Sequence, residues 1–303
     1  LIDMYAKCGN LIKAQEVFDE IKIPNVISWT TLITGYAEYG DYDNTLHYFD
    51  QMQLKGMSPN AVTFVCILKA CSSLRNADKG RGLHAEIERQ GLLEKDIIVG
   101  NALVDMYARC GLLYLSQELF GKIPTRNVVS WNAIITGCVE HGYVEEALDQ
   151  YDQMQREGFY ADAITFASSL KACSMMKAFD TGQEIHAVAE KQGLIQSDVV
   201  VGSAIVDMYV KCRMLRKARE VLEELPVRYA STWNALISGY IHQGLPDNAL
   251  KCFKKMQCDG ISPNAVTYVC ILKACSTIRL VNIGEEIHKE IHKTELLRKN
   301  IIL

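Results

Sequence analysis

The stretch VVSWNAII, Val128–Ile135, occurs in three versions in this chain of 303 residues. The other two are VISWTTLI at Val26–Ile33 and ASTWNALI at Ala230–Ile237, so successive copies begin 102 residues apart. All three tryptophans of the chain stand at the same place in these copies. A spacing that does not vary means that the intervening segments have fixed lengths too, and such a fixed period indicates a repeat array.

Composition limits the class of protein. Hydrophobic residues make up 49% of the chain, which excludes a disordered chain, and no apolar run approaches the roughly 20 residues that span a bilayer. We therefore expect a soluble protein with no membrane partner. The net charge of -4 argues against an ordinary nucleic-acid-binding surface, which is usually basic, although a few cations in a groove can coexist with an acidic outer face.

The chain has eleven cysteines, and eight of them recur with the repeat. Because they lie in apolar segments, we expect small buried thiols in a reducing compartment and no disulfide framework. The recurring sets are Cys8, Cys110 and Cys212; Cys71, Cys173 and Cys275; and Cys66 and Cys270.

Alignment on the apolar heptamer divides the period into segments of 35, 36 and 31 residues. The chain reads as one continuous array, cut at both ends, so we expect a piece of a longer protein whose targeting sequence and terminal domains lie outside it. The segments are 1–25 (partial), 26–60, 61–96, 97–127, 128–162, 163–198, 199–229, 230–264, 265–300 and the start of another at 301–303.

Each segment shows helical apolar spacing that is interrupted once, which predicts two helices and a turn. We expect glycines in the left-handed conformation to end the first helices at Gly40, Gly142 and Gly244. We expect the first helices to be capped by Ser28, Ser130 and Thr232. The pattern predicts an all-α fold of stacked helical hairpins, with the first helices lining one surface and the tryptophans and Met52, Met154 and Met256 packed between repeats.

Three further features together resemble the pentatricopeptide repeat (PPR) family. They are the order of the three lengths, the motif LVDMYARCG at Leu103–Gly111 and the motif LKACS at Leu170–Ser174. The resemblance covers essentially the whole chain, and the lengths look like the P, L and S variants of plant-type organellar RNA-editing factors. It implies a right-handed superhelical α-solenoid. The tetratricopeptide pattern, which has a fixed period of 34 residues, does not fit.

The resemblance implies that each repeat faces one nucleotide of single-stranded RNA and that two side chains select the base. Short amides and hydroxyls suit this role because they donate to and accept from the edge of a base. The pairs are Thr30 with Asn60, Val65 with Asp96, Asn101 with Asn127, Asn132 with Asp162, Ala167 with Asp198, Ser203 with Tyr229, Asn234 with Asn264, and Val269 with Asn300.

By the same resemblance, an aliphatic residue at the second place of a repeat wedges against the bases. These residues are Ile27, Val62, Ile98, Val129, Ile164, Val200 and Val266, and Ser231 breaks the series. The family's pairing rules assign the bases A, unassigned, C, U, unassigned, unassigned, C, unassigned. Alternatively, an isolated Asn or Asp at these places has a structural role in a turn or as a helix cap. Selector side chains held in contacts between hairpins would count against this interpretation.

Phosphate contacts need cations near the selectors. Lys69, Lys171 and Lys273 each follow a selector by four residues, which is one helical turn, and are the first candidates. Lys7, Arg109 and Lys211 also recur, but each follows an Asp by four, so an ion pair within the helix is an equal alternative. With about three to six contacts, the logarithm of the binding constant should fall with the logarithm of salt with a slope of about -2 to -4.

Two segments resemble the start of a deaminase zinc motif. His84-Ala85-Glu86 and His288-Lys289-Glu290 lie at one repeat position, but the third copy is His186-Ala187-Val188 and no Cys-x-x-Cys completes a site. His288 and His292 also lack the order of a zinc protease motif. We therefore expect no enzyme, no metal and no cofactor.

The leading hypothesis is a sequence-selective single-stranded RNA-binding module. By resemblance it acts in a mitochondrion or chloroplast, directs RNA editing or processing, and works with editing-complex proteins or a separate deaminase. One alternative is a protein-interaction scaffold that holds a peptide in the same groove. Another is an enzyme whose catalytic domain lies outside this chain.

Overall fold

The computed structural model describes residues 1–293, and within that range the regular structure is helical, without a strand. The expected all-α class is confirmed. The helices are α1 Ile2–Lys7, α2 Leu11–Asp19, α3 Val26–Glu38, α4 Tyr42–Leu54, α5 Ala61–Leu74, α6 Ala77–Arg89, α7 Leu92–Lys95, α8 Ile97–Arg109, α9 Leu113–Lys122, α10 Val128–Glu140, α11 Val144–Arg156, α12 Ala163–Met176, α13 Phe179–Lys191, α14 Leu194–Ser197, α15 Val199–Lys211, α16 Leu215–Glu224, α17 Ala230–His242, α18 Pro246–Cys258, α19 Ala265–Thr277 and α20 Val281–Lys293.

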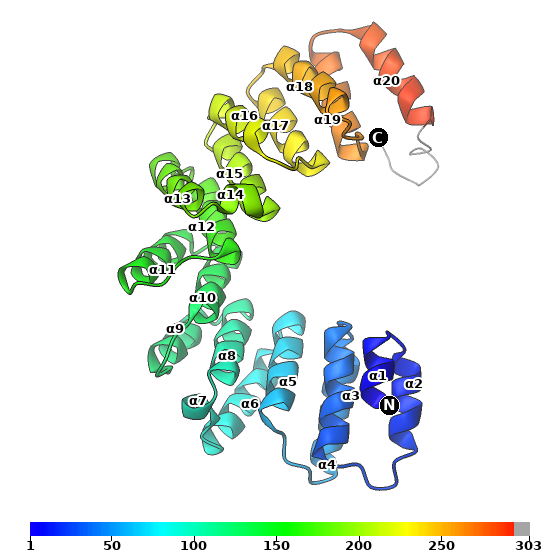
Figure 1. Ribbon diagram of the computed structural model, residues 1–303, viewed down its shortest axis with the longest axis vertical. Helices are drawn as coiled ribbons and strands as arrows, with labels where there is room; N and C mark the ends of the chain where they lie inside the picture. Colours follow the sequence, from blue (N-terminus) through cyan, green and yellow to red (C-terminus); the bar gives the residue numbers. More distant parts are fainter. Residues whose placement is uncertain (294–303) are drawn as a thin grey trace. The chain divides into compact units, whose positions relative to one another are not determined.

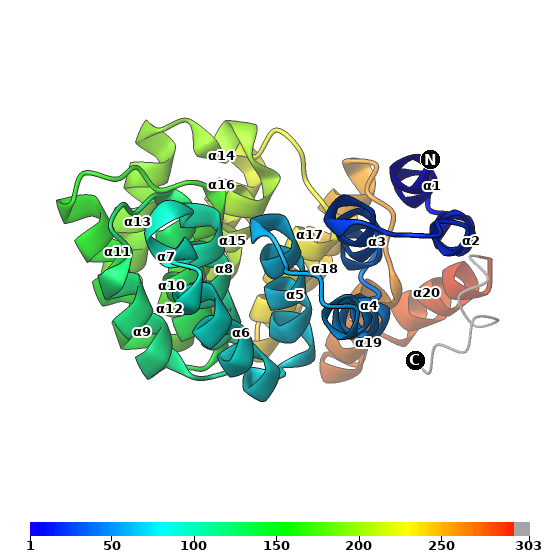
Figure 2. The same ribbon diagram turned by 90° about the horizontal axis from the view of Figure 1, so that it is seen from below.

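The helices form two compact units, Leu1–Tyr160 and a second that begins at Ala161. In the first unit, α1, α3, α5, α8 and α10 pack side by side in chain order (Figures 1 and 2). In the second, α12, α15, α17 and α19 do the same. Within each unit, the second helix of a hairpin packs on its own first helix and on the first helix of the next hairpin. Each unit is therefore a two-layer stack of hairpins.

The first helices begin with the sequence segments, at residues 26, 61, 97, 128, 163, 199, 230 and 265. Their caps are not the ones that the sequence suggested. The side chain of Asn127 caps α10 by accepting a hydrogen bond from the backbone N–H of Ser130 at 3.0 Å, and Asn25 caps α3 through Ser28 at 2.9 Å. The assignment of Ser28, Ser130 and Thr232 as caps was wrong, because each is the third residue of its helix. The N-cap is the residue with extended backbone three positions earlier, which is Asn25, Asn127 or Tyr229.

The three segment lengths differ in their second halves. Segments of 35 residues have second helices of 13 residues, for example α4 and α11. Those of 36 add the short helices α7 and α14 of four residues each, and those of 31 shorten the second helix to ten residues in α9 and α16. The repeat boundaries themselves stay a prediction.

Left-handed backbone ends the first helices in two ways. Gly40, Gly142 and Gly244 have φ values of 76°, 81° and 72°, so the glycine prediction is confirmed. In the 36-residue segments, the basic residues Arg75, Lys177 and Arg279 adopt the same conformation. The sequence did not predict this. Within residues 1–293, no helix combines the length and the apolar character needed to cross a bilayer.

The recurring large side chains form the core. Trp131 is fully buried and meets Phe120 edge to face, with ring centroids 4.7 Å apart, and Trp29 meets Phe18 in the same way at 4.6 Å. Met52, Met154 and Met256 are also fully buried. Both ring contacts join neighbouring segments, so packing between repeats is confirmed for these two tryptophans, and for the methionines burial is confirmed.

The cysteines follow the prediction in part. All eleven lie in the described residues as free thiols, and burial raises the pKa of the Cys71 thiol to about 12, so it stays protonated at neutral pH. Cys173 and Cys275 are buried as well. Burial was wrongly expected at Cys8, which is exposed, and at Cys110, Cys212 and Cys270, which are half-buried. Cys8, Cys110 and Cys212 are the C-cap residues of α1, α8 and α15, where the helix packing ends.

Neighbouring first helices approach each other most closely at glycines. A Cβ at Gly137 would overlap the Cβ of Ala108 on α8 and lie 3.2 Å from its Cα, and one at Gly35 would lie 2.7 Å from the Cβ of Ala6 on α1. Only a residue without a side chain allows this separation of α8 and α10.

We expect Gly137→Ala to lower the free energy of unfolding by about 1–3 kcal/mol, because the added methyl forces α8 and α10 apart. Gly82→Ala is the matched control. It lies inside α6 with no atom near its Cβ position, so it should raise stability by about 0.5–1 kcal/mol. Urea unfolding of both variants measures the difference, and equal stability of Gly137→Ala and the parent would contradict the close approach.

Two recurrent histidines give stability a pH dependence. His84 Nδ1 lies 3.1 Å from the hydroxyl of Tyr107, and His186 Nδ1 lies 2.8 Å from that of Tyr209. Burial lowers the pKa of both histidines, against the opposing effects of Glu88 at the first and Glu190 and Glu224 at the second. Both histidines are therefore kept neutral in the folded chain.

A histidine with a lowered pKa in the fold binds its proton more readily when unfolded. Its contribution to stability is therefore complete above the unfolded value, near 6.5, and is lost as the pH falls through the folded value. The double variant His84→Gln with His186→Gln should lose less stability than the parent between pH 7.5 and pH 5. Urea unfolding across that range tests this, and parallel profiles for the two proteins would refute it.

Candidate nucleic-acid interface

Polar side chains from consecutive hairpins form a hydrogen-bond relay where α8 meets α10. Ser130 Oγ donates to Asn101 Oδ1 at 2.6 Å, and Asn101 Nδ2 donates to Asn127 Oδ1 at 3.2 Å. Asn127 Oδ1 also accepts from the backbone N–H of Ser130, so both members of a predicted selector pair are bonded to each other and to the start of the next helix.

The same relay recurs where α17 meets α19. Thr267 Oγ1 donates to Asn234 Oδ1 at 2.7 Å, and Asn234 Nδ2 donates to Asn264 Oδ1 at 3.0 Å. A shorter version joins α3 and α5, where the hydroxyls of Thr30 and Thr63 lie 2.8 Å apart. The relay hydroxyls at Thr63, Ser130 and Thr267 were missed as site residues. Their recurrence at the third helical place was the available signal.

Asn101 and Asn234 are therefore held between neighbouring hairpins. Asn101, Asn132 and Asn234 are each 7% exposed. The helix-cap alternative is also realised, since the second members of the pairs cap the following first helices: Asn60, Asp96, Asn127, Asp162, Asp198 and Asn264. This arrangement counts against a ladder of free side chains.

The relay does not use all of the hydrogen-bonding capacity of the amides. Asn101 Nδ2 carries a second N–H, and its Oδ1 has a second lone pair. The Nδ2 of Asn127 donates to no described residue, and Asn127 is only half-buried. The relay thus fixes the orientation of the amides and leaves donors and acceptors for a ligand.

The predicted wedge residues are exposed at the same junctions. Their exposed fractions range from 53% to 72%, which is unusual for Ile and Val. They stand at the second helical position, one residue before the relay hydroxyls. The residues are Ile27, Val62, Ile98, Val129, Ile164, Val200 and Val266.

A hollow of about 210 Å³ lies in the first unit where α1, α3 and α5 meet. Its lining brings together the first selector pair, Thr30 and Asn60, and the two aliphatic residues Ile27 and Val62. A hydroxyl, an amide and two apolar side chains thus border one cavity. Such a site suits a flat ring with polar edges.

Three predicted selectors lack this chemistry. Val65 and Ala167 are half-buried and Val269 is 46% exposed, and none of the three can form a side-chain hydrogen bond. Ser203 Oγ lies 3.1 Å from the hydroxyl of Thr232. Asn300 lies outside the described residues.

Three exposed lysines share a register with the hollow. Thr34, the ninth residue of its segment, lines the hollow, and Lys69, Lys171 and Lys273 are the ninth residues of theirs. All three are exposed, and none forms an ion pair within residues 1–293. Their charges are available to a phosphate.

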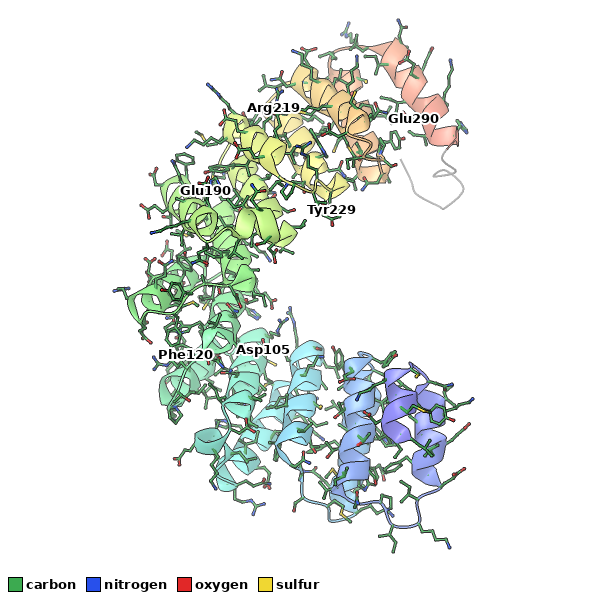
Figure 3. All side chains as sticks on the ribbon, viewed as in Figure 1. Asp105, Phe120, Glu190, Arg219, Tyr229 and Glu290 are labelled. Atoms are coloured by element: carbon green, nitrogen blue, oxygen red, sulfur yellow. The ribbon has the colours of Figure 1, made fainter. Side chains whose placement is uncertain are left out.

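The other recurring cations are more constrained. Lys7 Nζ lies 2.9 Å from Asp3, and both residues line the hollow. Arg109 is held between Asp105 at 2.9 Å, labelled on α8 in Figure 3, and Glu140 of the next hairpin at 3.4 Å. Lys211 forms no ion pair with a described residue.

The histidines of two of the three histidine segments pack against tyrosines. His84 and His186 bond to tyrosines of the next segment, and Glu86 bonds to Arg89 at 2.6 Å. In the described part of the chain, no group of three or more His, Cys, Asp or Glu side chains is arranged to hold a metal ion.

Comparison with known proteins identifies the repeat. A model of the PPR repeat family matches residues 24–73, 126–175 and 229–277, and a PPR repeat model matches 1–23, 101–128 and 203–228. A crystal structure of the pentatricopeptide repeat protein PPR10 in complex with an 18-nucleotide psaJ RNA element matches with a TM-score of 0.74 at 19% identity, covering 94% of this chain and 43% of that one. This likeness confirms the helical-repeat fold.

Curated relatives are longer than this chain. A chloroplastic pentatricopeptide repeat-containing protein of Arabidopsis thaliana is 35% identical over 280 residues, which are 92% of this chain and 45% of that protein. A mitochondrial one from the same plant is 33% identical over 293 residues, 97% of this chain and 28% of that protein. The chain spans less than half the length of these two relatives.

Proposed function

We propose that this chain, which belongs to the pentatricopeptide repeat family, binds single-stranded RNA and selects bases at the junctions between its hairpins. The observation that carries the proposal is the hollow bordered by Thr30, Asn60, Ile27 and Val62. It joins a polar pair able to read a base edge to two aliphatic side chains able to flank the base faces, which is the chemistry that RNA readers of one base per repeat require.

In this proposal the relay supplies orientation. A carboxamide that rotates freely can present either its donor or its acceptor, whereas one whose Oδ1 accepts from Ser130 and whose Nδ2 donates to Asn127 presents a fixed set. Fixed donors and acceptors discriminate between bases because a wrong base leaves them without partners. The engagement of Asn101 between hairpins then becomes part of the readout.

The comparisons support the proposal and its setting. The PPR10 structure that this fold resembles was solved with an RNA element, and relatives carry chloroplastic or mitochondrial names. We extend the proposal to an organellar factor of the PLS class that directs RNA editing or processing, with editing-complex proteins as partners. The proposal includes no catalytic step, metal or cofactor.

A protein-interaction scaffold is the second candidate. The exposed Ile and Val residues at the junctions would also bury apolar surface against a peptide, and the chain carries a net charge of -4. A peptide ligand would not depend on the identity of an RNA base, so base-swap experiments separate the two candidates.

Base selection is tested with an eight-nucleotide RNA that carries A, C, U and C at positions 1, 3, 4 and 7. Each correct base contact contributes about 1–3 kcal/mol, so scrambling the four assigned bases should weaken binding at least about tenfold. Asn101→Thr converts an Asn/Asn pair to Thr/Asn and should move the preference at position 3 from cytosine to adenine. Titration by fluorescence anisotropy measures both effects.

Asn264→Asp is the companion variant in the second unit. Asp already caps α12 and α15, so the substitution keeps the cap and should move the preference at position 7 from cytosine to uracil. Threonine hydroxyls already bridge α3 and α5, so Asn101→Thr also keeps a junction contact. Equal affinity for assigned and scrambled RNA, or unchanged preferences in both variants, would contradict the proposal.

The exposed lysines set the salt dependence. Replacing Lys69, Lys171 and Lys273 by Ala should lower the magnitude of the slope of log K against log salt by about 2, because each phosphate contact on a single strand contributes about 0.7. A triple variant of Lys55, Lys191 and Lys254, which are exposed at other places, changes the net charge equally. The same slope change in both triple variants would show that position does not matter.

A further inference from the structure

The junction between α15 and α17 departs from the others at two places. The second selector place holds Tyr229, and its side chain forms no capping hydrogen bond with α17. The second place of α17 holds Ser231, where the seven other complete segments have an exposed Ile or Val. One junction has thus lost both its cap amide and one of its two aliphatic wedges.

The side chain of Tyr229 is exposed and forms few contacts within the fold. It lies where the loop after α16 leads into α17 (Figure 3), and it is 49% exposed. Within residues 1–293 its ring meets no other aromatic ring and its hydroxyl forms no hydrogen bond. The core of this region is formed by Trp233 and Leu225, which are 1% and 3% exposed. The fold therefore makes little use of Tyr229.

The aromatic side chain of Tyr229 can replace the apolar surface that is missing at Ser231. At the first junction of the chain, a cavity is flanked by two aliphatic side chains, Ile27 and Val62. At the junction of α15 and α17 the corresponding residues are Val200, which is 61% exposed, and Ser231, which offers almost no apolar surface. Tyr229, two residues before Ser231, supplies an exposed aromatic side chain at this junction.

Edge readout is weak at this junction because Tyr229 offers a phenol where the other pairs offer an amide or a carboxylate. The hydroxyl of Ser203 lies 3.1 Å from that of Thr232, a contact of the same kind as the one between Thr30 and Thr63. Stacking on an aromatic ring, in contrast, tolerates every base, because each base has a π face.

We propose that Tyr229 stacks on the base at the junction of α15 and α17, in place of the missing wedge, so that this nucleotide is held without being selected. The inference rests on the proposed function, because it requires RNA to lie along the junctions. The sixth nucleotide of the eight is then an anchor of any base, between selected positions at the fourth and seventh nucleotides.

The experiment compares five RNAs that differ only at the sixth nucleotide: four with A, C, G or U and one with an abasic ribose. The parent chain should bind the four bases within about threefold of one another and the abasic RNA about tenfold more weakly. Tyr229→Ala should remove the difference between abasic and base-containing RNA, and Tyr229→Phe should keep it. Because the side chain forms no hydrogen bond in the fold, melting followed by circular dichroism should give similar curves for all three proteins.

An abasic penalty that Tyr229→Ala leaves unchanged would overturn the stacking role, as would a parent chain that binds abasic and base-containing RNA equally. Tyr229→Asn restores the residue type of other junctions and should make the four bases unequal. The third nucleotide serves as an internal reference, since it faces Asn101 and Asn127. If affinity depends on the base at the third nucleotide but not on the loss of the base at the sixth, only the inference on Tyr229 fails. If affinity depends on neither, the proposed base-selective RNA binding is rejected as well.

Discussion

The structure depends on one repeated contact, the hydrogen bond between a polar side chain of one first helix and a hydroxyl at the start of the next. Its instances are Ser130 to Asn101, Thr267 to Asn234, Thr30 with Thr63, and Ser203 with Thr232. The first three bonds lie at buried places, where an unpaired partner would cost about 1–3 kcal/mol. The contact therefore fixes the register in which one hairpin stacks on its neighbour.

The same contact links stability to recognition. A selector side chain that is 7% exposed cannot rotate to fit different ligands. The packing of the two helices therefore determines the direction of its remaining hydrogen-bonding groups. The aliphatic residues at the second helical position are exposed one residue before the relay hydroxyls, so an exposed apolar side chain stands next to a buried polar contact at the start of these first helices. A base can use both at once, which is why the junction, and not a single helix, is the unit of the proposed site.

The sequence predicted the helical hairpins, the left-handed glycines and the buried tryptophans, because periodic apolar spacing determines all three. It placed the helix caps wrongly at Ser28 and Ser130, since the pattern does not distinguish a cap from the third helical residue. It also did not reveal the relay, because a bond between Asn101 and Ser130 joins residues from different hairpins. The left-handed conformation of Arg75 could not be predicted either, since arginine rarely adopts it.

The central claim is that one relay both joins hairpins and orients a base reader. Ser130→Ala removes the hydroxyl that donates to Asn101 Oδ1 while leaving every selector in place. The most direct test measures its preference for cytosine over adenine at the third nucleotide together with its free energy of unfolding. The account predicts that both fall, the second by about 1 kcal/mol. A variant that is less stable yet as selective as the parent would contradict it.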